Sequence, residues 1–175
     1  EGFGAFPKWF LDKYPGSLNQ TLTPNKPRTV SFYDSVFREK TVTWFTELQR
    51  QVLKDFIGPG KPASFLQIDN ETNYFWDTVY ERDRKPESIR RFREFVSLKY
   101  GRDLASVSAA YGAPIVSFGD INAPKGPNDV GYPLPAWHYD WFQFHDEEIR
   151  DYYVFLRRTW ESLGVTEPNV LFTSC

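Results

Sequence analysis

An asparagine and a glutamate, Asn70 and Glu71, directly follow a short apolar run at residues 63–69. The run is preceded by a Gly-Pro-Gly breaker, and its length and apolar character are typical of a buried strand. A barrel enzyme presents a catalytic acid in this way, as a carboxylate at the end of a strand and at the mouth of the barrel. Glu71 is therefore the first candidate for a catalytic residue.

The strand that ends before Asn70 follows a predicted helix at residues 34–57. Asp34 or Ser35 is suited to cap the start of this helix, and the breaker at residues 58–60 ends it. Its apolar residues recur with helical spacing, at Phe37, Thr41, Trp44, Phe45, Leu48, Val52 and Phe56. A helix followed by a strand is half of a βαβ unit.

Beyond Glu71 the pattern predicts three more helices and one more strand. These elements are predicted at residues 86–101, 103–111, 136–163 and 169–174. Long loops are predicted at residues 1–30, 73–85 and 113–135, the first with one helical turn. The order of helix, strand, helices and strand indicates a parallel sheet with helical crossovers.

The chain is too short to close a barrel of eight strands. It has 175 residues, whereas such a barrel needs about 250. We therefore expect part of a single catalytic domain over residues 1–175, with no internal domain boundary. The sequence contains no methionine, which leads us to expect a processed or excised polypeptide.

Composition excludes several classes of partner and cofactor. A net charge of −2 gives no footprint for nucleic acid, and no apolar stretch approaches the roughly 18 residues of a membrane span. The single cysteine, Cys175, cannot form an internal disulfide or a thiolate zinc site. We expect a soluble protein of bacterial source, cytoplasmic or secreted, without an organic cofactor.

Aromatic residues make up 18% of the chain, with 6 Trp, 10 Tyr and 16 Phe. Most of them have the spacing of core residues, but aromatic faces also stack on sugar rings. Tyr74 and Trp76 lie just after Glu71 and are candidates for sugar contact. Trp9 is either a sugar platform or a lid on the helix at residues 34–57, and the sequence leaves both readings open.

We expect structural roles rather than metal binding or catalysis for two histidines and one aspartate near the start of the last helix. His138 and His145 lie about two turns apart without a pattern of paired carboxylates, so no metal site is expected. Asp140 is expected to cap the helix or form an ion pair rather than to catalyse.

Several motifs have a shared order that is improbable by chance. They are Phe6-Pro7-Lys8-Trp9-Phe10-Leu11, Gln67-Ile68-Asp69-Asn70-Glu71, Phe92 through Lys99-Tyr100-Gly101, Ala110-Tyr111-Gly112 and Asp140-Trp141-Phe142-Gln143-Phe144. In this order they resemble β-galactosidase-type glycoside hydrolases of family 42. Echoes of family 35 occur at the start and in residues 171–174, and both families belong to clan A.

The resemblance implies a segment of a (β/α)8 TIM barrel, roughly from the end of the third strand to the fifth strand, with long βα loops. It implies a retaining exo-β-glycosidase that hydrolyses terminal β-linked sugars. Glu71 would be the general acid/base, and Asn70 would bind the sugar 2-hydroxyl. Such enzymes pair the acid with a second carboxylate about 5–5.5 Å away, which acts as the nucleophile.

The nucleophile of this clan is a glutamate at the end of the seventh strand, which the resemblance places outside this sequence. No acidic residue ends the strand at residues 169–174 to replace it, so this chain alone is expected to be inactive. The family usually continues Asn-Glu with Tyr-Gly, whereas Thr72-Asn73-Tyr74 follows here, which leaves the sugar open. Because family 42 enzymes are often trimers, a homo-oligomer is also implied.

Two other functions remain open at this point. One is another clan A β-glycanase, agarase-like, and the loops at residues 1–30 and 113–135 would decide because they shape the distal pocket. The other is a carbohydrate-binding barrel segment without turnover. A glutamate at the end of the seventh strand of the parent sequence would favour the enzyme over the binding protein.

Overall fold

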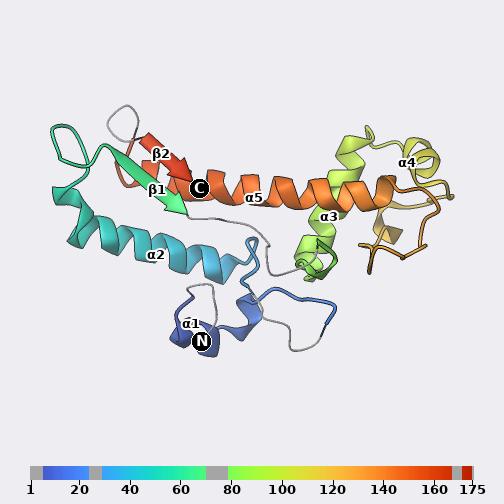
Figure 1. The fold of residues 1–175 in the computed structure, drawn as a ribbon, viewed down its shortest axis with the longest axis horizontal. Coiled ribbons are helices and arrows are strands. Elements are labelled where there is room, and N and C mark those ends of the chain that lie inside the picture. Colours follow the sequence, from blue (N-terminus) through green and yellow to red (C-terminus); the bar gives the residue numbers. More distant parts are fainter. Residues whose placement is uncertain (1–5, 24–28, 70–78, 167–170, 175) are drawn as a thin grey trace. The chain divides into compact units, whose positions relative to one another are not determined.

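The computed structural model of the protein describes residues 6–23, 29–69, 79–166 and 171–174 (Figure 1). The chain divides into two compact units, each made of two stretches that are distant in sequence. Unit 1 contains residues 1–31 and 74–147, and unit 2 contains residues 32–73 and 148–175. The expectation of one catalytic domain over the whole chain stays a prediction.

Unit 2 begins with helix α2, Ser35–Gln51, whose start is confirmed. The carboxylate of Asp34 caps the helix by accepting a hydrogen bond from the backbone N–H of Phe37 at 2.9 Å. The helix ends at Gln51 rather than near residue 57. Val52 leaves the helical region with φ −126° and ψ −60°, and a 3₁₀ turn, Leu53–Asp55, follows.

Two parallel strands form the sheet of unit 2. Strand β1, Phe65–Asp69, lies beside strand β2, Leu171–Ser174 (Figure 1). Several helices lie between the two strands in sequence, so the predicted parallel pairing with a helical crossover is confirmed. The burial predicted for the first strand is wrong at Phe65, which is 65% exposed. Among the described residues β1 pairs with β2 and with no other strand.

The core of unit 2 joins α2 and the sheet to the end of helix α5, Ala136–Ser162. Phe45 stacks on Trp160 with ring centroids 4.4 Å apart. Residues that pack around this pair come from both strands and from the segments beside them, namely Leu48, Ile57, Leu66, Ile68, Val165 and Phe172. Trp44 does not join this core as predicted and is 62% exposed. One residue turns a helix by about 100°, so Trp44 points away from the side on which Phe45 packs.

Unit 1 contains the short helix α1, Lys8–Lys13, and two longer helices, α3, Pro86–Lys99, and α4, Leu104–Tyr111. It also contains the first residues of α5 and three 3₁₀ turns, at Pro15–Ser17, Val79–Glu81 and Phe118–Asp120. None of the helices in the described ranges combines the length and apolar character needed to cross a bilayer.

Local chemistry explains where these helices begin and end. Pro86 occupies the first turn of α3, where a missing N–H costs nothing. The Asp103 carboxylate accepts from two backbone N–H groups at the start of α4. Gly112 ends α4 in the left-handed conformation with φ +71°. These caps, and the long irregular segment from 113 to 135, are confirmed.

Aromatic rings fill the core of unit 1. Phe92 of α3 meets Trp141 of α5 edge to face, with ring centroids 5.0 Å apart. Phe144 and Tyr111 are also buried. Fewer than half of the described aromatic residues of unit 1 are buried, so the prediction that most aromatic residues are core residues is not confirmed for this unit.

A buried carboxylate, Asp83, connects two distant stretches of unit 1. Its Oδ2 accepts hydrogen bonds from the hydroxyls of Ser31 and Ser88, both at 2.6 Å. Its Oδ1 accepts from the backbone N–H of Gln20 at 2.9 Å and of Lys85 at 3.1 Å. The desolvation cost of this charge is offset because every bond to it is charge-assisted.

We expect Asp83→Ala to lower the free energy of unfolding of the full-length protein by about 3 kcal/mol, because it leaves buried donors without an acceptor. Urea titration followed by circular dichroism measures this change. Asp12→Ala is the matched control, because Asp12 is exposed and pairs only with Lys8 across one helical turn. Equal stability of the two variants would contradict a stabilising role for Asp83.

Candidate active site at the end of strand β1

Four of the five predicted site residues, Asn70, Glu71, Tyr74 and Trp76, lie outside the described residues. Trp9 is described and lies on α1. Its ring meets the buried Phe10 edge to face at 5.9 Å, and the residue is 59% exposed. Its indole is therefore accessible in unit 1, and its predicted role as a sugar platform or lid stays a prediction.

Strand β1 ends at Asp69, the residue directly before Asn70. Gln67 lies opposite Thr173 and Asp69 lies opposite Ser174, so β1 has one extra residue at this point. Such a bulge bends the strand and changes the direction of the side chains that follow, and bulges are frequent beside active sites. The irregularity therefore falls where the chain leads into the candidate acid.

Tyr152 of α5 holds the end of this strand. Its hydroxyl donates a hydrogen bond to the carboxylate of Asp69. The Tyr152 ring is buried and stacks on Phe32, with centroids 4.3 Å apart and planes 6° apart. Burial raises the pKa of Tyr152, and the negative charge and hydrogen bond of Asp69 raise it further. The hydroxyl therefore stays protonated and donates at neutral pH. The sequence predicts a helix over Tyr152, but residue spacing carries no signal of its polar contact with Asp69.

The two histidines, His138 and His145, contact other protein groups. His138 Nδ1 lies 3.3 Å from the Tyr80 hydroxyl, and His138 Nε2 lies 3.2 Å from the backbone oxygen of Asp129. His145 is buried and meets Trp141 edge to face at 4.2 Å. Within the described ranges, no group of three His, Cys, Asp or Glu side chains is placed to hold a metal ion.

Asp140 has the structural role that the sequence predicted. Its buried carboxylate pairs with Lys99 Nζ at 2.6 Å and accepts from the Tyr111 hydroxyl at 2.9 Å. Burial and this carboxylate raise the pKa of Tyr111, and the same causes raise the pKa of Tyr100 to about 12. The carboxylate is thus occupied by partners in the core of unit 1.

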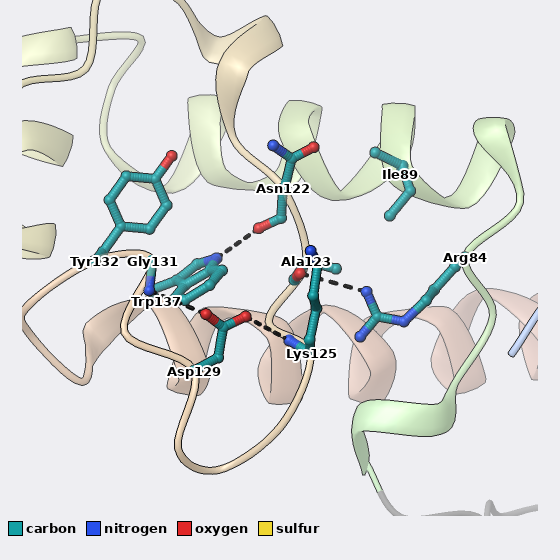
Figure 2. A pocket seen from close by; sticks show the side chains of 9 residues that line it. All are labelled: Arg84, Ile89, Asn122, Ala123, Lys125, Asp129, Gly131, Tyr132 and Trp137. Atoms are coloured by element: carbon teal, nitrogen blue, oxygen red, sulfur yellow. Dashed lines mark hydrogen bonds between the residues drawn. The ribbon is translucent and has the colours of Figure 1, made fainter. Parts of the chain in front are cut away.

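A pocket of about 590 Å³ opens within unit 1 (Figure 2). One end is aromatic, where Tyr132 meets Trp137 edge to face with centroids 4.9 Å apart. The sides carry polar groups of Asn122, Lys125 and Asp129, and the far end carries Arg84 and Ile89. The sequence pointed to the loop at residues 113–135 but not to these side chains. Their convergence depends on contacts with α3 and α5.

Hydrogen bonds to the backbone hold the loop that forms this pocket. Trp137 Nε1 donates to the backbone oxygen of Asn122 at 2.6 Å. Asp129 accepts from the backbone N–H of Lys125 at 2.7 Å and of Gly131 at 3.0 Å. The guanidinium of Arg84 donates to the backbone oxygens of Tyr80, Ala123 and Pro124. The shape of the pocket is therefore fixed although its loop has little regular structure.

The chain is similar to known proteins in sequence. The sequence model of glycoside hydrolase family 42, described as beta-galactosidase, matches residues 2–172. A protein of Ignavibacterium album named beta-1,2-glucosyltransferase is 24% identical over 164 residues, which are 92% of this chain and 23% of that protein.

Two solved structures are similar to the whole described fold. One is Gan42B, a family 42 β-galactosidase from G. stearothermophilus, with a TM-score of 0.70, and the other is a catalytic mutant of the same enzyme, with a TM-score of 0.68. Each is 19% identical and covers 98% of this chain, which in turn covers 24% of each structure. The chain thus spans about a quarter of the length of these relatives.

We expect Tyr152→Phe to lower the free energy of unfolding by about 1–2 kcal/mol at pH 7, since Asp69 loses a buried donor while the stack on Phe32 remains. Urea titration of the full-length protein measures this loss. Tyr139→Phe, which changes an exposed tyrosine of the same helix, is the control. A loss no larger than that of the control would contradict the contact.

The same tyrosine predicts a dependence on alkaline pH. A raised pKa in the native state gives stability that is complete below the unfolded tyrosine pKa of about 10 and is lost as the pH rises toward the native pKa. Above pH 10 the wild type should therefore lose up to about 1.4 kcal/mol per pH unit more than Tyr152→Phe. If the free energy of unfolding falls with pH at the same rate for the two proteins, the prediction is contradicted.

Proposed function

Since the chain belongs to glycoside hydrolase family 42, the β-galactosidase family, we propose that it carries the general acid/base of a retaining exo-β-glycosidase. Glu71 is the residue proposed for this role. The fold is a segment of the (β/α)8 barrel, roughly from the end of the third strand to the fifth. Catalytic residues of such barrels lie at the carboxyl ends of the strands.

The observation that carries the proposal is the place where β1 ends. The strand is parallel to β2 and ends at Asp69, so Asn70 and Glu71 are the next residues at its carboxyl end. The irregularity before Asp69 and the bond from Tyr152 act on the residue that directly precedes this pair in the sequence. In this proposal Tyr152 is a positioning residue, because it acts on Glu71 only through Asp69.

The proposed reaction has two steps that use Glu71 in opposite protonation states. In the first, Glu71 donates its proton to the leaving glycosidic oxygen while a glutamate elsewhere in the longer polypeptide attacks the anomeric carbon. Burial and the charge of that second carboxylate raise the pKa of the acid, so it is protonated when substrate binds. In the second, Glu71 takes a proton from water, which attacks the glycosyl-enzyme and releases the sugar.

The other predicted residues have binding roles in this proposal. Asn70 donates to the sugar 2-hydroxyl, a contact that strengthens in the transition state. Trp9, Tyr74 and Trp76 supply aromatic surfaces for the apolar face of the sugar. In this proposal the nucleophile is a glutamate outside these 175 residues, and without it these residues would have no turnover.

A second candidate function follows from the beta-1,2-glucosyltransferase that is similar to this chain. Transfer to a sugar hydroxyl and hydrolysis share the first step, and they differ only in what attacks the glycosyl-enzyme. In a transferase Glu71 would activate the hydroxyl of an acceptor sugar in place of water.

Hydrolysis of a panel of aryl β-glycosides by the full-length protein, with and without Glu71→Ala, tests the assignment. We expect kcat to fall by roughly 10²–10⁴ for ordinary leaving groups. The loss should be much smaller for an activated leaving group, which needs no proton. Azide should restore turnover in the variant and yield a β-glycosyl azide, because a small anion can enter the space left by the side chain.

The control for this kinetic test is a substitution at an exposed glutamate. Glu94→Gln changes an exposed glutamate of α3 that pairs with Arg90 and should leave kcat unchanged. If Glu71→Ala behaves like this control, Glu71 is not the acid/base. If a disaccharide product forms only when an acceptor sugar is present, the protein is a transferase rather than a hydrolase.

A further inference from the structure

None of the described residues that line the pocket of unit 1 has been assigned a part in the proposed reaction. We propose that it is a saccharide-binding site that places one pyranose ring beside Tyr132 and bonds its hydroxyls through Asn122, Lys125 and Asp129. The choice of a sugar over another polyhydroxy ligand rests on the proposed function. The binding itself rests on the following contacts.

The polar groups of the pocket suit neighbouring hydroxyls. Each carboxylate oxygen of Asp129 accepts one backbone N–H and keeps a second lone-pair site for a ligand. The amide of Asn122 donates to the backbone oxygen of Asp120 at 3.1 Å and accepts from Arg93 at 3.3 Å, so one N–H and one lone pair remain for a ligand. The exposed Lys125 adds an ammonium group, which donates. The sides of the pocket therefore offer both donors and acceptors, as the hydroxyls of a sugar require.

The pocket places one cationic side chain that is free to bind a ligand, Lys125, near one carboxylate, Asp129. Arg84 uses four of its five N–H groups on backbone oxygens, so it acts as a wall rather than as a ligand group. Arg84 keeps its positive charge, so Arg84, Lys125 and Asp129 sum to +1, but the carboxylate of Asp129 repels an anion from the side chains that are free to bind a ligand. A neutral ligand rich in hydroxyls fits this balance better than a phosphate or a sulfate.

Tyr132 supplies the aromatic surface, because it is half-buried whereas Trp137 behind it is fully buried. Burial raises the pKa of the Tyr132 hydroxyl, with a smaller contribution from Asp120, so the hydroxyl is a donor at neutral pH. Gly131 is needed for this arrangement. A Cβ at that position would lie 2.8 Å from Cη2 of Trp137, and the residue would have to move together with Tyr132.

The pocket is formed before any ligand binds. Bonds from Trp137, Arg84 and Asp129 fix its loop, as described above, and Arg93 Nε adds a bond to the backbone oxygen of Ile121 at 2.8 Å. A ligand that enters a fixed site does not have to order the loop, and this lowers the entropic cost of binding. The volume of about 590 Å³ lies within the usual range of small-molecule sites.

Calorimetric titration of the full-length protein tests the inference. The background carries Glu71→Gln, so that no probe is turned over, and the probes are methyl β-D-galactopyranoside, methyl β-D-glucopyranoside and lactose. We expect Tyr132→Ala to weaken one binding event roughly tenfold or more. Tyr132→Phe should weaken it by roughly twofold to tenfold through loss of the hydroxyl. Tyr139→Ala, at an exposed tyrosine of α5, is the matched control and should change nothing.

Melting temperatures of the variants separate loss of binding from loss of folding, and Tyr132→Phe serves if Tyr132→Ala does not fold. Identical binding curves for wild-type and folded Tyr132 variants would overturn the inference. Displacement of the sugar by inorganic sulfate at equal concentration would also overturn it, because the pocket would then be an anion site. Chromatography of each probe after the titration shows whether it was hydrolysed, so a failure of the Glu71 assignment is distinguished from a failure of the binding inference.

Discussion

The parallel pairing of β1 with β2 is the constraint on which the placement of the candidate acid depends. Backbone hydrogen bonds along residues 65–69 and 171–174 set the direction in which the chain leaves the sheet. The core around Trp160 holds both strands against α2 and α5. Tyr152 then holds Asp69, the last residue of β1, through a hydrogen bond to its carboxylate. Glu71 follows Asp69 by two residues in the sequence, and a one-residue shift of register would turn the side chains of β1 to the other face of the sheet.

Two buried aspartates of unit 1, Asp83 and Asp140, have structural roles rather than catalytic ones. Asp83 is surrounded by hydroxyls and backbone N–H groups, and Asp140 is paired with a lysine and a tyrosine. A catalytic carboxyl must exchange a proton with substrate, which needs an accessible oxygen. Both aspartates instead use their oxygens to join segments that are far apart in sequence, and this explains why a buried acid is no sign of catalysis here.

Much of the fold could be predicted because short stretches determine it. Asp34, Pro86, Asp103 and Gly112 act on their own helices, and each does what its residue type requires. The exposure of Phe65 and Trp44 could not be predicted, since it depends on which other segments cover them. The bond between Tyr152 and Asp69 and the lining of the pocket join residues that are distant in sequence, and residue spacing does not reveal such pairs. Glu71 could be predicted as a candidate because the apolar run at residues 63–69 leads directly into it, and the resemblance to a family then implied its role as general acid/base.

The open side of β1 has a consequence for how the polypeptide is made. Among the described residues β1 has one neighbouring strand, and the exposed ring of Phe65 stands on it. A strand edge of this kind accepts any extended segment that offers backbone hydrogen bonds. While this edge is unpaired during synthesis, extended segments of other chains can form backbone hydrogen bonds with it. The order in which strands leave the ribosome, and the help of chaperones, therefore bear on the yield of native protein as directly as the stability of the finished fold does.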